Sequence, residues 1–379
     1  MLAQEQKTLE TSQTKVLPFV QENAGNSGNF QELEKCPVRK LAFDIGNRRT
    51  KIAYGGNANI QATGFPSVVA KTENGHSNRS FLDGSGQDWI YGTGAERAQN
   101  PRRMLSDLGS LTKARKLAEF DLFFRAPIVR VTNLKELEKV QCFELVISTS
   151  VSQEDYQYLK ETAESLTEMY IGGKLYRYEI EVSAIVPEGW GIIREGRCES
   201  REGVLFDFGH GTNIITFFKA NPFEVDRQPL PLGCAGVYTA WSKKAAKSCG
   251  GVLVDPQILA SALDREQIVV TPNGRGRKAR QDRYLYQFVT DSDLNEAYNA
   301  ALTEAVAEHW EKISEVSLFT NAIENAKLSG HTLKACGGGA ILFANQLETL
   351  GVEIVDDPVT ANVRGLQGWL NVQGGRKHG

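Results

Sequence analysis

Short apolar runs separated by glycine and polar residues dominate the first half of this chain. Residues 41–54 contain two such runs around a polar tip, and the residues of interest there are Asp44, Gly46, Asn47 and Lys51. Two β-type runs joined by a tip that contains glycine and asparagine predict a β-hairpin. Amide groups at such a tip that have no partner in the ladder form a concavity suited to an anion.

The charged residues of this hairpin add chemistry to that concavity. A carboxylate such as Asp44 can hold Mg²⁺ through water, and a lysine such as Lys51 can neutralise phosphate as a point charge. The alternative is an ordinary hairpin with one inward-facing acid. This segment alone does not decide between the two.

The same pattern occurs a second time, and a glycine cluster follows late in the chain. Residues 203–218 again contain two apolar runs around a polar tip, with Asp207, Gly209, His210, Gly211 and Thr212. Residues 333–343 contain Gly337, Gly338 and Gly339 between apolar residues. Glycines let a backbone approach a planar base or ribose closely.

These three motifs, in this order, resemble the phosphate-1, phosphate-2 and adenosine motifs of the actin superfamily. The resemblance covers residues 40–370 and implies an α/β, actin-like fold in which two α/β domains flank a nucleotide cleft. By that resemblance Asp44 and Asp207 hold Mg²⁺ through waters, and Lys51 neutralises phosphate oxygens. The backbone near Gly46, Asn47, Gly209, Gly211 and Thr212 cradles phosphates, and residues 337–339 pack on the adenosine.

Three further segments narrow the resemblance to the ParM-like plasmid-segregating actins of bacteria. Residues 65–67 read Phe-Pro-Ser, residues 187–188 read Pro-Glu just before the second hairpin, and residues 357–366 resemble the closing segment of those proteins. Glu188 matches the glutamate that faces the terminal phosphate in the family. A carboxylate there can orient water or take its proton. The alternative is a surface glutamate after a turn proline.

The remaining pattern predicts an alternation of strands and helices, which is typical of α/β proteins. Residues 143–151 read as an apolar strand, and Ser152 with Asp155 predicts a capped helix that follows. Residues 97–116 carry cationic side chains and predict the solvated face of a helix. A long amphipathic helix is expected from Asp291 to beyond Trp310.

The expected domains follow from the motif order. Residues 1–37 are polar and predict a disordered tail. Residues 38–190 with 360–379 form the predicted first actin-like domain, and residues 191–359 the second. Residues 271–283 read as a charged loop, and contact with phosphate, an acidic partner or DNA is the alternative.

Composition restricts the functional class further. A net charge of −3 gives no reason to expect direct binding of nucleic acid or of a membrane. Six cysteines without C-x-x-C spacing indicate reduced thiols rather than zinc or disulfides, and no apolar run is long enough to span a bilayer. A cytoplasmic protein is expected.

Two features depart from the resemblance. His210 stands where the family often has an acid or glycine, and an imidazole changes charge near neutral pH, so nucleotide affinity is expected to vary with pH. Arg48 and Arg49 stand where relatives have small polar residues. They either face the triphosphate or point to solvent.

The resemblance therefore implies a filament-forming hydrolase of ATP, or of GTP, with Mg²⁺. Its expected partners are further copies of itself and a DNA-binding adaptor that links the filament to a plasmid. A small-molecule kinase of the same superfamily, or a nucleotide-sensing scaffold with weak hydrolysis, is the alternative.

Overall fold

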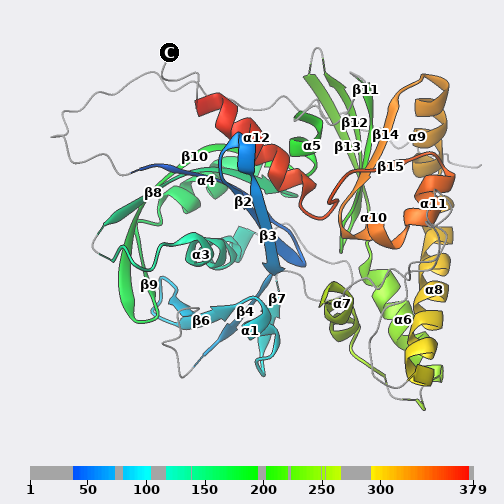
Figure 1. Ribbon diagram of the computed structural model, residues 1–379, viewed down its shortest axis with the longest axis horizontal. Helices are drawn as coiled ribbons and strands as arrows, with labels where there is room; N and C mark the ends of the chain where they lie inside the picture. The colour runs from blue at the N-terminus through cyan, green and yellow to red at the C-terminus, as the bar shows by residue number, and fades with distance from the viewer. Residues whose placement is uncertain are drawn as a thin grey trace, which may run out of the picture.

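In the part of the chain that is described, the strands form two β-sheets, one of ten strands and one of five (Figure 1). The computed structural model describes residues 37–72, 80–103, 117–137, 139–194, 202–220, 223–248, 250–251, 253–265 and 292–374. The predicted tail therefore lies outside the described residues except for Pro37, and so does the charged segment 271–283.

The ten-stranded sheet contains both strands of the first predicted hairpin. Its strands are β1 (Arg39–Ile45), β2 (Arg49–Tyr54), β3 (Gln61–Pro66), β4 (Val68–Lys71), β5 (Ser80–Leu82), β6 (Asp88–Tyr91), β7 (Pro101–Arg103), β8 (Val140–Thr149), β9 (Glu168–Ile171) and β10 (Lys174–Pro187). Their order in the sheet is β3-β2-β1-β8-β10-β9-β5-β6-β4-β7. Strand β1 pairs antiparallel with β2 and parallel with β8, so the first hairpin lies in the interior of the sheet.

The five-stranded sheet contains the second predicted hairpin. Its strands are β11 (Glu202–Phe208), β12 (Asn213–Ala220), β13 (Phe223–Leu230), β14 (Thr332–Cys336) and β15 (Glu353–Ile354). The order is β13-β12-β11-β14-β15, with β11 antiparallel to β12 and parallel to β14. The third glycine cluster follows β14 directly, which places it beside the second hairpin.

Helices cover both sheets and connect them. The α-helices are α1 (Thr93–Glu96), α3 (Phe120–Val131), α4 (Tyr156–Glu164), α5 (Trp190–Arg194), α6 (Ala235–Ser248), α7 (Pro256–Arg265), α8 (Ser292–Ser314), α9 (Ser317–Leu328), α10 (Gly338–Leu342), α11 (Ala344–Thr349) and α12 (Ala361–Gly374). Two 3₁₀ turns, η1 (Asn57–Asn59) and η2 (Gln153–Asp155), complete the described elements. Among these residues no helix has both the length and the apolar character needed to cross a bilayer.

The alternation of side chains along β1 explains why this strand is buried on both faces. Leu41, Phe43 and Ile45 point into the large core that includes α3, where Phe43 and Phe124 lie 6.1 Å apart between ring centroids. Ala42, on the opposite face, belongs to a separate cluster with α12. Asp44 shares that second face by alternation and is 4% exposed.

The second sheet packs against its own set of helices, which lie on the right of Figure 1. Phe206 and Phe208 of β11 join the core formed with α6, α8 and α9. The predicted long helix is confirmed as α8, and Asp291 lies just outside the described residues. Of the positions expected on its core-facing stripe, Ala301 and Ala305 are buried, Tyr298 is half-buried and Leu294 is exposed.

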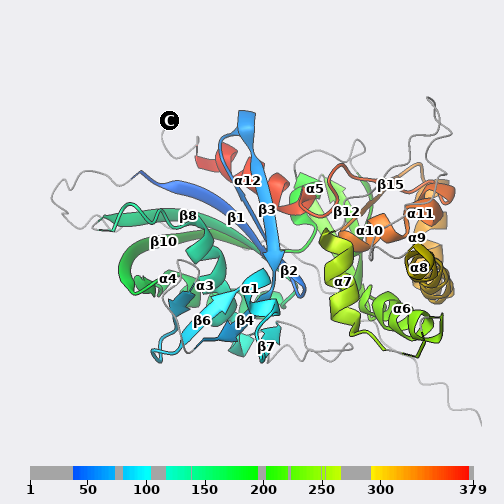
Figure 2. The ribbon, with the colours of Figure 1, turned by 60° about the horizontal axis from the view of Figure 1, so that its bottom comes forward.

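The short helix α5 and the final helix α12 meet between the two sheets (Figure 2). The Gly191 amide donates to Asn362 Oδ1 at 3.0 Å, and Asn362 Nδ2 donates to Ser148 Oγ at 3.0 Å. A Cβ atom on Gly365 would stand 2.2 Å from the Gly191 carbonyl oxygen, so these two helices touch through their backbones. This contact explains the sequence of the closing segment, because Asn362 and Gly365 are the residues that form it.

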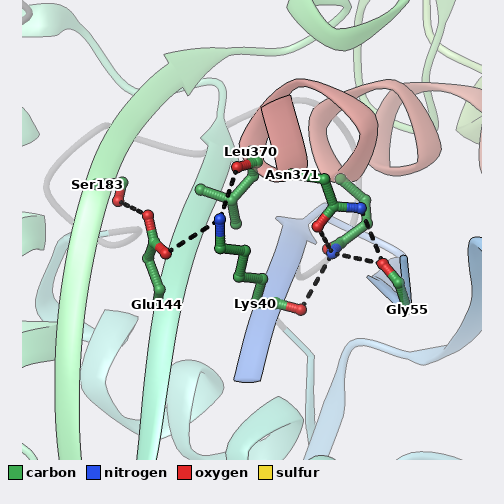
Figure 3. A network of polar contacts seen from close by, with 7 residues as sticks. Lys40, Gly55, Glu144, Ser183, Leu370 and Asn371 are labelled. Atoms are coloured by element: carbon green, nitrogen blue, oxygen red, sulfur yellow. Dashed lines mark hydrogen bonds and ion pairs between the residues drawn. The ribbon is translucent and has the colours of Figure 1, made fainter. Parts of the chain in front are cut away.

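A network of polar contacts attaches α12 to the first sheet (Figure 3). Lys40 Nζ donates to the carbonyl of Leu370 at 3.3 Å and forms an ion pair of 3.6 Å with Glu144. Gln367 Nε2 donates to the backbone carbonyls of Lys40 and Gly55 at 3.1 and 3.2 Å. Helix α12 is therefore held by the sheet that carries the first hairpin.

Two local predictions from the sequence are wrong. Arg102 and Arg103 lie on strand β7 and not on a helix, because residues 101–103 pair with β4; residues 104–116 lie outside the described part. Ser152 does not cap the following helix, since its hydroxyl donates to the Asp155 carboxylate at 2.8 Å. The boundaries proposed for the two domains stay a prediction.

The backbone contact between α5 and α12 generates the first test. We expect Gly365→Ala to lower the free energy of unfolding by about 2 to 3 kcal/mol, because an added methyl group meets backbone that cannot move aside. Gly94→Ala is the control, since a Cβ there meets nothing within 4 Å. Chemical denaturation measures both variants, and equal stability of Gly365→Ala and wild type would contradict the contact.

Candidate functional site

A cavity of about 360 Å³ lies where the two hairpins and the glycine cluster meet. It collects nearly all the residues singled out from the sequence: Asp44, Gly46, Asn47, Lys51, Glu188, Asp207, Gly209, Thr212, Gly337, Gly338 and Gly339 line it. Gly211 is not among the lining residues. Its carbonyl carbon would be 2.3 Å from a Cβ on Gly233, so the loop before α6 packs against it, and Gly211 is half-buried.

Acidic groups surround Lys51 at one end of the cavity. Asp44 faces Lys51 directly across the β1–β2 ladder, and Lys51 Nζ lies 3.0 Å from Asp44 Oδ2. Burial disfavours the charge on Lys51, but Asp44, Asp207 and Glu188 outweigh that effect and raise the pKa of its ammonium group. Lys51 is the only lysine among the described residues that line the cavity.

Asp207 has no cation of its own on the neighbouring strand. Its partner in the β11–β12 ladder is Ile214, at the position where the first hairpin carries Lys51. Burial and the nearby Glu188 carboxylate raise the pKa of Asp207 to about 6, although Lys51 and Arg227 act in the opposite direction. The two hairpins thus share one lysine between two aspartates.

The carboxylates fit a magnesium ion held through water. Asp44 Oδ1 is buried and has no hydrogen-bond partner among the described residues. In the same part of the chain, no three His, Cys, Asp or Glu side chains lie close enough to chelate a metal on their own. Mg²⁺ commonly keeps several waters and binds one or two carboxylates together with substrate phosphates. That mode is the one expected for Asp44 and Asp207.

Ser67, which lies between β3 and β4, holds the tip of the first hairpin in place. Ser67 Oγ donates to the Gly46 carbonyl at 2.6 Å and lies 3.0 Å from Thr50 Oγ. The Ser67 amide also donates to the Arg48 carbonyl at 2.7 Å. The Phe-Pro-Ser segment recognised in the sequence therefore fixes the backbone of the tip, and Ser67 makes the contacts.

The second tip is fixed in a different way, by the residues that lead into α6. The amides of Cys234 and Ala235 donate to the carbonyls of Gly209 and His210 at 3.0 and 2.9 Å. Gly233 lies so close to the tip that a Cβ would be 2.4 Å from the His210 carbonyl oxygen. The tip and the start of α6 consequently form one unit.

The three glycines of the late cluster differ in what they require. Gly337 has φ +84° and a Cβ there would be 2.5 Å from Asp207 Oδ1, so glycine is needed for both conformation and space. A Cβ on Gly339 would be 2.3 Å from Cys234 Sγ. Gly338 has neither constraint, since its Cβ would meet nothing within 4 Å and would point into open space beside the cavity.

The two departures from the resemblance both line the cavity. Arg48 and Arg49 do so, and Arg49 Nη2 also donates to the Gly64 carbonyl at 3.0 Å. Burial, together with Arg48 and Arg103, lowers the pKa of His210 to about 3. The expected titration of His210 near neutral pH is therefore wrong, because the ring stays neutral across that range.

Sequence reasoning missed the apolar wall of the cavity and one nearby cation. The wall includes Phe208, Ile214, Cys234, Tyr238, Leu263, Ile341, Leu342 and Val359. These side chains follow the ordinary apolar periodicity of strands and helices, so nothing in the sequence marks them as special. Arg227 Nε and Nη2, on β13, are buried without a hydrogen-bond partner among the described residues, and the side chain lies near enough to Asp207 to lower its pKa.

The cysteines that the structure describes agree with the expected reduced state. Cys142, Cys234 and Cys336 are buried thiols that form no disulfide with one another. Burial raises the pKa of Cys234 to about 12 and that of Cys336 well above its usual range. Neither of these two thiols, of which Cys234 lines the cavity, is therefore a ready nucleophile.

No protein-family model and no curated protein matches this sequence. Solved structures do match over nearly the whole chain. A ParM from Bacillus thuringiensis with ATP matches at 14% identity and a TM-score of 0.58, covering 89% of this chain and 99% of that one. An archaeal actin homolog in complex with ADP matches at 17% identity and a TM-score of 0.55, covering 89% and 100%.

The chain has the actin-like fold. A filament structure of Alp12 matches as well, at 16% identity and a TM-score of 0.53, covering 89% of this chain and 99% of that one. The resemblance seen in the three motifs is thereby confirmed for the α/β, actin-like architecture. At these identities the matches establish the fold alone, and the roles of the cavity residues stay predictions.

The raised pKa of Asp207 can be tested on the ligand-free protein. An unfolded aspartate has a pKa of about 3.9, whereas that of Asp207 is raised to about 6. Between these values the folded state holds a proton that the unfolded state has lost, so the free energy of unfolding falls as pH rises. We expect Asp207→Asn to gain about 3 kcal/mol over wild type at pH 7.5 and to be nearly equal to it at pH 3.5, below the pKa of the unfolded aspartate.

Denaturation with urea across this pH range checks the expectation. The difference between variant and wild type is the quantity to follow, because it removes the contribution of other titrating groups. A difference that does not change with pH would show that Asp207 keeps an ordinary pKa.

Proposed function

We propose that this protein is a nucleoside triphosphatase whose nucleotide binds in the cavity between the two hairpins. The observation that carries the proposal is the cluster of Asp44, Lys51, Asp207 and Glu188 in a cavity that is also lined by apolar side chains and by Gly337–Gly339. A triphosphate needs cations and amide donors at one end, and a base and ribose need a flat, apolar surface at the other.

Each residue has a distinct role in the proposed reaction. Lys51 neutralises phosphate oxygens, and the braced tip near Gly46 and Asn47 presents backbone amides to them. Asp44 and Asp207 anchor waters around a magnesium ion, which would neutralise phosphate charge when bound. Glu188 orients the attacking water and accepts its proton. Positioning and charge stabilisation supply most of the catalysis in phosphoryl transfer.

The adenosine end of the cavity belongs to the third motif. The open side of Gly338 leaves room for a ribose or base to lie against the backbone, and Ile341 and Leu342 supply apolar contacts. Both ATP and GTP are compatible with these contacts, with ATP favoured by the resemblance to the adenosine motif.

We further infer that the triphosphate state assembles into filaments and that hydrolysis destabilises them. The solved structures that support this inference are of a ParM with ATP and of an Alp12 filament. Repeated head-to-tail contacts that do not close generate filaments. A role in moving a plasmid or another DNA element, through a DNA-binding adaptor and in the cytoplasm, is the cellular part of the proposal.

Sedimentation with ATP, GTP, ADP or no nucleotide, combined with phosphate release and negative-stain microscopy, tests the function. We expect pelleting only with a triphosphate and release of phosphate from the pellet. Phosphorylation of a small molecule without pelleting would establish the kinase alternative. Nucleotide binding without release or pelleting would establish the sensing scaffold.

Glu188 and Asp207 are separated by their predicted roles. Glu188→Gln should retain nucleotide affinity and lose turnover by roughly 10²- to 10⁴-fold, because a group that positions water acts mainly in the transition state. Asp207→Ala should lose both affinity and turnover, because a magnesium anchor is removed. Filaments of Glu188→Gln should outlast those of wild type.

Isothermal titration, phosphate release and polymer lifetime measure these effects. Glu168→Gln is the matched control, since Glu168 is exposed on β9, away from the cavity. Wild-type turnover in Glu188→Gln would remove Glu188 from the reaction and make His210 the next candidate for positioning water.

Gly338 provides a test of the adenosine end that spares the fold. Gly338→Val should abolish nucleotide binding while leaving the stability of the protein unchanged. The backbone of Gly338 is not left-handed, so the effect comes from the space that the side chain fills and not from strain. Gly84→Val is the control, because its Cβ also meets nothing within 4 Å and it lies outside the cavity. Unchanged affinity in Gly338→Val would remove the third motif from the site.

A further inference from the structure

Three side chains that neither hairpin motif requires form a stack on the wall of the cavity. The Arg48 guanidinium carbon lies 5.0 Å from the centre of the Tyr238 ring, within the range of a cation–π contact. The His210 ring stacks against the same tyrosine, with centroids 5.7 Å apart and planes inclined by 27°. All three residues line the cavity.

The stack connects the two halves of the site. Arg48 comes from the tip of the first hairpin, and His210 from the tip of the second. Tyr238 lies in the first turn of α6, whose start is hydrogen-bonded to the second tip through the Cys234 and Ala235 amides. Tyr238 and His210 are therefore fixed to the second sheet, and Arg48 reaches them from the first.

The neighbours of Arg48 preserve its positive charge at a defined place. His210 is neutral because burial, Arg48 and Arg103 lower the pKa of its imidazole to about 3, so the ring does not repel the guanidinium. Tyr238 is 6% exposed and cannot swing away. An arginine side chain loses considerable rotamer freedom when it is fixed, and a preformed contact removes that cost from ligand binding.

The cavity needs a cation besides Lys51. Lys51 already faces Asp44 at 3.0 Å, and the carboxylates of Asp207 and Glu188 also act on it. Arg49 also lines the cavity, but its Nη2 is directed to the Gly64 carbonyl at 3.0 Å. One lysine among three acids therefore leaves a need for a further cation at a nucleotide phosphate chain. A fixed guanidinium near the hairpin tips supplies that cation, and the benefit grows with the negative charge of the ligand.

We propose that Arg48, positioned by Tyr238, is a specificity-determining residue that favours triphosphate over diphosphate ligands in this cavity. The proposal rests on the proposed nucleotide site and names the residue that distinguishes a triphosphate from a diphosphate. Because the proposed interaction of Arg48 is with phosphate charge, the preference does not depend on the base. ATP against ADP and GTP against GDP should show the same dependence on Arg48.

The experiment measures two ratios in a set of variants. One is the dissociation constant for ADP divided by that for ATP, and the other is the constant for GDP divided by that for GTP. Arg48→Gln should lower both ratios on the order of 10-fold, by loss of a charged hydrogen-bond donor. Tyr238→Leu should lower both ratios by a smaller factor. Tyr238→Phe, which keeps the ring, should leave them at their wild-type values. The double variant Arg48→Gln/Tyr238→Leu should match Arg48→Gln alone, because the tyrosine acts through the arginine.

Several outcomes would overturn the proposal. Unchanged ratios in Arg48→Gln, with wild-type affinity for both nucleotides, would remove Arg48 from phosphate recognition and leave the proposed function intact. Additive losses in the double variant would show that Tyr238 acts independently of Arg48. A wild-type protein that binds none of the four nucleotides would defeat the proposed function itself. Should Tyr238→Leu not fold, Arg48→Gln and Tyr238→Phe still decide the proposal.

Discussion

Repulsion among three carboxylates that converge on one lysine is the constraint on which this site depends. Asp44 is buried, Asp207 and Glu188 are half-buried, and the single ammonium group of Lys51 does not neutralise all three. A folded protein tolerates such a cluster only if rigid elements hold it together. The strand ladders do so, because Asp44 and Asp207 lie within paired strands and Glu188 directly follows β10. The excess of negative charge favours a ligand that binds together with cations.

The two hairpins resemble each other in backbone and differ in the chemistry around their tips. The first has its lysine opposite the aspartate and is braced by Ser67 from the next strand. The second has Ile214 at the lysine position and is braced by backbone from the start of α6. The asymmetry gives the second aspartate its raised pKa and makes it depend on a residue from the other sheet. The charge of Asp207 on the second sheet is thus balanced in part by Lys51 on the first sheet.

The sequence was sufficient to predict the hairpins, the actin-like fold and most of the cavity lining, because glycine, aspartate and lysine at fixed spacing express local backbone requirements. Contacts between distant segments were not predictable in this way. Tyr238 reads as one more apolar position of α6, yet it receives Arg48 from the other sheet. His210 was expected to titrate near neutral pH, and only its burial among cations shows that it does not. Gly211 belongs to the motif, but it packs against Gly233 and does not line the cavity.

The backbone contact of Gly191 with Gly365 leaves no room for a side chain between α5 and α12. Beside it Trp190 packs edge-on against Trp369, with ring centroids 5.0 Å apart, and the two helices share two apolar clusters. The Asn362 side chain bonds both α5 and β8 across this contact and prevents the helices from sliding along each other. The two large cores on either side share no residues. Under the proposed function, a change of one phosphate in the cavity would reach a neighbouring copy in the filament through this junction between the two halves.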